Sequence, residues 1–185
     1  MRAGLYSVLL ALCLAGCGSL PATQQTPYLP PGVFGAYQDN DVGGVNFAAW
    51  AFASPANTRN NPVAGAKAIV ALEYLPGELR ENPRWIRMDA AIPYRLGQAR
   101  DEAERILGIA PNAPRQLIVN ALLAVAWNFQ TGNRAGAMQA LASPVFTFPP
   151  EQTLAILSNL PYMKRANLWS SRAEDQLYTP GGPWS

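Results

Sequence analysis

Carboxylates, tyrosines, arginines and two lysines are the side chains that could carry out chemistry in this chain of 185 residues, because histidine is absent. Its absence removes the most common general base, the Ser-His-Asp and Cys-His nucleophile systems, and the usual ligands of zinc, copper and iron. Paired carboxylates could still perform general acid and base catalysis. The candidates are Glu73, Glu78, Glu81, Asp89, Asp101, Glu102 and Glu104. None of them stands in an apolar strand-end or glycine-rich context that would indicate a shifted pKa, so we expect neither catalysis nor a cofactor.

Two local arrangements of acidic residues have simpler interpretations than a catalytic or metal site. The stretch 39–44, Asp-Asn-Asp-Val-Gly-Gly, begins like a calcium loop. The twelfth position of an EF-hand loop needs a glutamate, but counting from Asp39 that position is Trp50. A solvated turn is therefore the better interpretation, and no metal is expected. Asp101 and Arg105 are four residues apart, which predicts an ion pair on the surface of a helix.

Asn120 interrupts the most apolar stretch of the chain, residues 117–127, and Asn128 follows two turns later on the same side. A buried amide must be hydrogen-bonded, because leaving it unsatisfied costs about 1–3 kcal/mol. The pair therefore predicts either hydrogen bonds to a neighbouring helix or contacts with a ligand. Trp127 and Phe129 adjoin it and would line an apolar cavity between helices. These four residues are the candidate site for a pocket or a partner.

The balance of charge argues against nucleic acid as a partner. The formal net charge is +2, whereas nucleic-acid binding needs a concentrated basic face. Arg80, Arg84, Arg87 and Arg95 are close together in the sequence. We interpret them as a solvated face, and the alternative is a contact for anionic lipid or an acidic partner.

The beginning of the chain indicates export. Arg2 precedes an apolar run, residues 5–14, which is too short to span a bilayer. Residues 14–17, Leu-Ala-Gly-Cys, resemble the lipobox of bacterial lipoproteins. That resemblance implies cleavage of a signal peptide, residues 1–16, and acylation of Cys17, which would hold the protein to a membrane through its acyl chains. The mature chain would then contain no second cysteine and no disulfide.

Prolines, asparagines and glycines punctuate the rest of the chain in a helical pattern. Residues 17–33 are rich in proline and uncharged, so we expect a flexible tether that could hold the domain about 50 Å from the membrane. Residues 34–178 should form one all-α domain of about six helices, and residues 179–185 a disordered tail. The expected helices are 62–75, 83–108 with a kink or break at Pro93, 114–129 as the central and most buried helix, 133–142, 150–160 and 162–177. Within 34–54 a helix over 45–53 is favoured over a strand.

Residues 117–149 resemble a tetratricopeptide repeat. Gly132 and Asn133 stand at its turn between helices, Ala137 at the small position of its second helix, and Pro149 at its end. The resemblance implies binding of a peptide or protein on a concave helical face. An ordinary helical hairpin is the alternative, because no second copy follows at a period of about 34 residues.

These observations predict an all-α, lipid-anchored protein of the cell envelope. Its domain would act without catalysis, as a binding or scaffold module for another envelope component, in the first instance a protein. A carrier of hydrophobic ligands with a cavity between helices is one alternative, and a carboxylate-dependent enzyme acting on envelope glycans is another. Gly18 follows the cysteine where enteric bacteria place an aspartate as an inner-membrane retention signal. This favours the outer membrane, facing the periplasm, if the organism has one.

Overall fold

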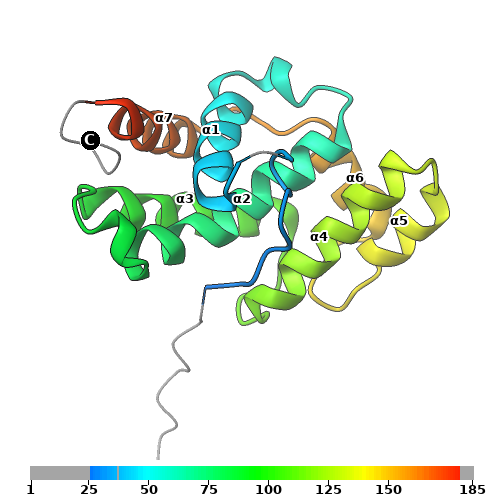
Figure 1. Ribbon diagram of the computed structural model, residues 1–185. Coiled ribbons are helices and arrows are strands. Elements are labelled where there is room, and N and C mark those ends of the chain that lie inside the picture. Colours follow the sequence, from blue (N-terminus) through cyan, green and yellow to red (C-terminus); the bar gives the residue numbers. More distant parts are fainter. Residues whose placement is uncertain (1–25, 37, 180–185) are drawn as a thin grey trace, which may run out of the picture.

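The computed structural model describes residues 26–36 and 38–179, and within these ranges the protein is all-α (Figure 1). The only extended pairing described is an isolated bridge between Ile109 and Phe146. The helices, including two short 3₁₀ segments, are α1 (Asn40–Ala53), η1 (Pro55–Asn57), α2 (Pro62–Glu81), η2 (Pro83–Trp85), α3 (Ala91–Leu107), α4 (Arg115–Gln130), α5 (Arg134–Leu141), α6 (Pro150–Ser158) and α7 (Lys164–Tyr178). The fold class is confirmed, and none of the described helices is long and apolar enough to cross a membrane.

The central helix of the fold is α2. The apolar composition of residues 114–129 had led us to expect α4 in that place. α2 packs against α1, α3, α4 and α6, and Figure 1 shows it crossing the middle of the molecule. Residues 68–72 of α2 are completely buried, because two alanines stand among the larger apolar residues and let neighbouring helices approach closely. α4 instead exposes Leu117 and Trp127. α4 therefore has more apolar residues than the core of the protein can cover.

Two prolines occupy positions different from those expected. α2 continues through Pro76 to Glu81, although we expected it to end at Leu75. Pro76 forfeits one backbone hydrogen bond, but Leu75 and Leu79 are buried on either side of it and keep the last turns packed. Pro93 lies in the first turn of α3, where helical N–H groups have no intrahelical acceptor. The expected helix 83–108 is thus two elements, η2 and α3.

The segment 26–33, which we call the strap, packs on the domain, whereas the sequence suggested a flexible tether. Leu29 and Val33 are 5% and 8% exposed. The side-chain amide of Gln116 accepts a hydrogen bond from the Tyr28 N–H (2.7 Å) and donates one to the Tyr28 carbonyl (3.1 Å). Apolar burial and this two-way pairing of a backbone amide hold the strap without secondary structure. Residues 17–25, with Cys17, lie outside the described ranges.

A glycine of α2 makes room for the first residue of the strap. A Cβ at Gly77 would overlap with the Thr26 hydroxyl. Thr26 Oγ1 in turn donates a 2.8 Å hydrogen bond to Glu81 near the end of α2. The strap therefore enters the domain at the C-terminal turn of α2 and then runs to α4.

Most helix ends agree with the sequence. The turn between α4 and α5 contains Gly132 at φ 73° and Asn133, whose side chain accepts a hydrogen bond from the Gly136 N–H. Residues 34–54 contain a helix, as favoured, but α1 starts at Asn40, five residues before the expected position. Of the expected tail, only Thr179 lies within the described residues.

Candidate functional site

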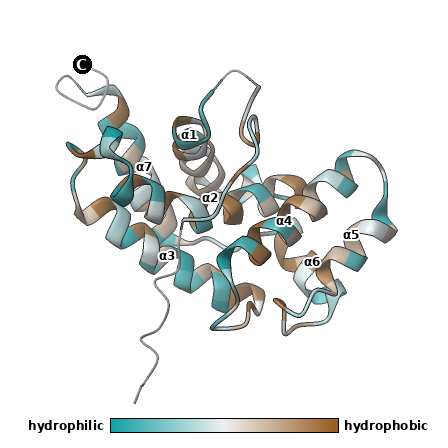
Figure 2. Cartoon of the chain, turned by 60° about the horizontal axis from the view of Figure 1, so that its bottom comes forward, coloured by the Kyte–Doolittle hydropathy of each residue, from teal (hydrophilic) through white to brown (hydrophobic). Residues whose placement is uncertain are grey.

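A groove of about 510 Å³ runs between α4 and the strap. Its walls are mostly apolar, and α2 contributes one charged side chain, Lys67. The lining residues are Pro30, Pro31, Gly32, Val33, Lys67, Leu123, Ala124, Ala126, Trp127, Asn128 and Gln130. Figure 2 shows α4 with hydrophobic positions in brown among hydrophilic ones in teal along its length. An apolar wall open to solvent is a feature of binding surfaces.

Trp127 presents a large apolar surface at the groove, because this residue is 67% exposed. An indole offers a large rigid face and one N–H donor, so it is suited to hold a ligand without loss of much conformational entropy. The strap lies opposite, with its prolines presenting a stiff rim. The groove is therefore preformed and open, in contrast to an enclosed cavity in the core.

The four predicted site residues do not form one site. Trp127 and Asn128 line the groove, whereas Phe129 packs against the core. Asn120 is exposed, and its Oδ1 accepts a 2.9 Å hydrogen bond from Gln116. Asn128 donates to the Ala124 carbonyl of its own helix. The prediction of a buried amide pair was wrong for Asn120, which is exposed. The Oδ1 of the half-buried Asn128, in contrast, accepts a 2.8 Å hydrogen bond from Asn133, the N-cap residue of the neighbouring helix α5.

Lys67 was missed in the sequence analysis. It is half-buried, and burial lowers the pKa of its ammonium group. The strap residues 30–33 were also missed, since proline-rich composition indicated a tether. Lys67 is more than 50 residues from Trp127 in the chain, and only the packing of α2 on α4 brings the two together. No local pattern of the sequence contains that information.

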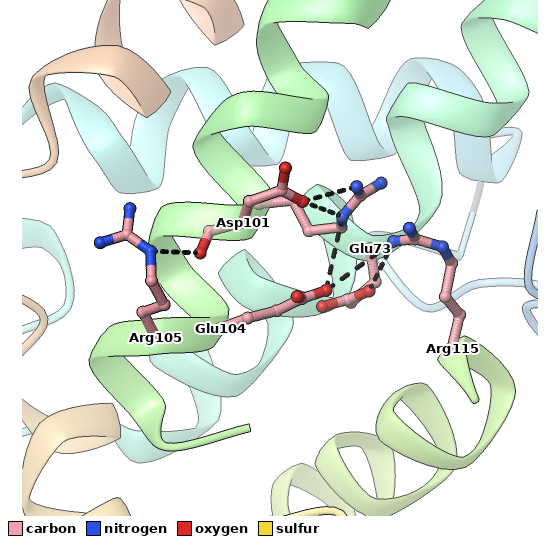
Figure 3. Close-up of polar contacts among 6 residues, drawn as sticks. Glu73, Asp101, Glu104, Arg105 and Arg115 are labelled. Atoms are coloured by element: carbon pink, nitrogen blue, oxygen red, sulfur yellow. Dashed lines mark hydrogen bonds and ion pairs between the residues drawn. The ribbon is translucent and has the colours of Figure 1, made fainter. Parts of the chain in front are cut away.

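A buried group of carboxylates and guanidinium groups joins α2, α3 and α4. The Glu73 side chain is 0% exposed and lies 3.3 Å from Arg115. Arg115 also lies 3.8 Å from Glu104, which pairs with Arg100 at 3.4 Å. Figure 3 shows Glu73, Glu104 and Arg115 pointing toward one another. The expectation that no carboxylate here has a shifted pKa was wrong.

Burial raises the pKa of Glu73 to about 8, and the nearby Glu104 carboxylate adds to the shift. Burial also raises the pKa of Glu104. Glu73 Oε1 has no hydrogen-bond partner among the described residues, whereas Oε2 accepts a 3.3 Å hydrogen bond from Arg115. The Glu73 side chain is inaccessible to solvent, and the cluster connects α2, α3 and α4.

The other acidic arrangements also differ from expectation. Asp101 does not pair with Arg105: the Arg105 Nε donates to the Asp101 backbone carbonyl, and the Asp101 carboxylate pairs with Arg100 at 2.6 Å. The stretch 39–44 is not a solvated turn but the beginning of α1. No group of three or more potential metal ligands occurs in the part of the chain that the structure describes.

Asp39 and Asp41 both lie 2.9 Å from Arg84 of η2. This ion-pair group borders a second, polar cavity of about 560 Å³ that also contains Tyr74 and Glu78. Arg84 is therefore part of a cross-link between α1 and η2, and not of a solvated face. Burial and the Glu78 carboxylate raise the pKa of Tyr74, so this tyrosine keeps its proton.

The other three arginines of the predicted solvated face, Arg80, Arg87 and Arg95, are exposed, and two of them have side-chain contacts. Arg80 pairs with its neighbour Glu81 at 2.7 Å. Arg95 lies over the rings of Tyr94 and Trp169, 5.7 and 5.9 Å from the centroids. A third cavity, of about 320 Å³, adjoins Trp169 between α3 and α7.

Comparison of the chain with protein-family models, with curated proteins and with solved structures finds no significant match. The function must therefore be inferred from the geometry alone. Of the arrangements described, the groove of α4 combines an open apolar surface with a polar and a charged side chain. It is the strongest candidate for a binding site.

Proposed function

We propose that this chain is a lipid-anchored protein of the cell envelope whose helical domain binds another envelope protein, without catalysis, in the groove between α4 and the strap. The open groove with its exposed Trp127 carries this proposal. Exposed aromatic side chains framed by polar residues are typical of protein-binding surfaces. The anchor itself would be Cys17, in the outer membrane facing the periplasm if the organism has one.

The form of the groove supports a protein partner over the two alternatives. A carrier of hydrophobic ligands needs a cavity that shields most of the ligand from water, whereas Pro31, Trp127 and Gln130 at the groove are exposed. A glycan hydrolase needs two carboxylates facing each other across a cleft that admits the substrate. Glu73 and Glu104 instead share the Arg115 guanidinium, and Glu73 is inaccessible.

Replacing Cys17 with serine should move the protein from the membrane fraction to the soluble fraction, because the thioether-linked acyl chains would be lost. Fractionation of cells that express the natural chain and the Cys17→Ser variant measures this directly. Mass spectrometry of the natural chain should give an N-terminal peptide that starts at Cys17 and carries acyl groups. An unmodified cysteine, or an N-terminus elsewhere, would contradict the anchor.

A photo-reactive amino acid at position 127 should crosslink to one dominant envelope protein in living cells, because the partner would cover the Trp127 side chain. Ile86 is the matched control, since it is also apolar and is 85% exposed but lies in the turn after η2, away from the groove. The probe at position 86 should not capture the same protein. Mass spectrometry identifies the product, and equal capture from both positions would count against a specific groove.

A further inference from the structure

Lys67 is an exception among the partly buried cations of the described residues. Arg84, Arg100 and Arg115 each lie within 3.8 Å of two carboxylates. Among the residues that the structure describes, no carboxylate forms an ion pair with the half-buried Lys67 ammonium. Carboxylates of the same chain thus neutralise the three arginines. Lys67, which lines the groove, has no such carboxylate partner in the described part of the chain.

A half-buried ammonium group without an acidic partner is unfavourable, because it has lost part of its hydration and gained no compensating charge. Burial is the sole cause of its lowered pKa, and no neighbouring charge raises the value. A carboxylate brought by a ligand would supply that compensation. The surrounding wall is apolar, with Val33, Leu123 and Trp127, so the same ligand must present apolar side chains as well.

We infer that the groove recognises a protein segment in which a carboxylate stands beside apolar or aromatic side chains, and that Lys67 pairs with the carboxylate while Trp127 covers the apolar part. This inference rests on the proposed function and specifies the chemistry of the partner. A volume of about 510 Å³ accommodates a few side chains of an extended or helical segment. A folded domain would contact the groove through such a segment only.

The test is selection of a random peptide library against the full, lipidated chain held in phosphatidylcholine nanodiscs. The enriched peptides should share an aspartate or glutamate next to an aromatic or aliphatic residue. Lys67→Gln should weaken the binding of a selected peptide about tenfold or more, because a partly desolvated charge would lose its partner. Lys67→Arg, which keeps the charge, should retain most of the binding. Lys164→Gln removes the only other lysine, an exposed one on α7, and should change nothing.

A double-mutant cycle then assigns the contact. Changing the acid of the peptide to its amide should weaken binding to the natural chain, and should have little further effect on the Lys67→Gln variant. Selected peptides that lack an acid and bind Lys67→Gln normally, but lose affinity for Trp127→Ala, would overturn the inference and leave the proposed function intact. Failure to select any peptide would overturn both. Stoichiometric binding of laurate that depends on Lys67, with no peptide bound, would overturn both in favour of a carrier.

Discussion

Replacing Gly65 with alanine should destabilise the protein by about 3 kcal/mol or more, the largest effect that we expect from any single methyl group. Gly65 lies in the first part of α2, where α6 crosses it, and a Cβ there would overlap with the backbone carbonyl of Leu157. A side chain could rotate away from such an overlap, but a helical carbonyl cannot. The two helices would have to separate, and their buried contact surface would be lost.

Gly97 is the matched control for this change. It lies inside α3, and the nearest atoms to a Cβ there are 3.9 and 4.0 Å away, which is ordinary van der Waals contact. Alanine should therefore stabilise α3 by about 0.5–1 kcal/mol, because it restricts the unfolded chain more than glycine does. Chemical denaturation of both variants measures the difference. Similar effects of the two substitutions would contradict the close crossing of α2 and α6.

Stability should fall as the pH rises from about 4.5 to about 8, because of Glu73. The pKa of Glu73 is raised from 4.5 to about 8 in the folded protein, so over this interval the unfolded chain binds fewer protons than the folded one. The free energy of unfolding then decreases by up to roughly 1.4 kcal/mol per pH unit for this group. The stabilising contribution of protonated Glu73 is fully present at a pH below its pKa in the unfolded chain. It is lost as the pH rises through its pKa in the folded protein. The raised pKa of Glu104 acts in the same direction.

Glu73→Gln should flatten this part of the profile and make the protein more stable than the natural chain at pH 8. A glutamine is neutral at every pH, and its side-chain oxygen can accept from Arg115 as Glu73 Oε2 does. Urea denaturation at pH 5, 6, 7 and 8 measures the slopes of both chains. Glu151→Gln, on the exposed start of α6, should leave the slope unchanged. A Glu73→Gln variant with the natural slope would contradict an uncharged Glu73.

The helices could be predicted from the sequence because their signals are local. The proline after Asn61 and the glycine before Asn133 indicated that both asparagines are N-caps. Both side chains accept the expected hydrogen bonds. The continuation of α2 through Pro76 was not predictable in this way. It depends on burial of Leu75 and Leu79 against other helices, which outweighs the local preference of proline for a helix end.

The candidate site was only partly predictable, for the same reason. Trp127 and Asn128 were found because they interrupt or end an apolar helix. Lys67 and the strap were not found, since their role arises from the packing of segments that are distant in the chain. Glu73 looked like any acidic residue on an amphipathic helix. Its raised pKa exists only because α3 and α4 bury it.

The packed strap would also limit how far the domain can move from the proposed lipid anchor at Cys17. Only eight residues lie between Cys17 and Thr26, where the chain joins the end of α2, and the greatest possible span from Cys17 to Thr26 is about 30 Å. A fully free tether would have allowed about 50 Å. The groove starts a few residues farther along, at Pro30. Every encounter would then take place in a thin layer beside the bilayer, where a partner held at the same membrane would meet the groove at a high effective concentration.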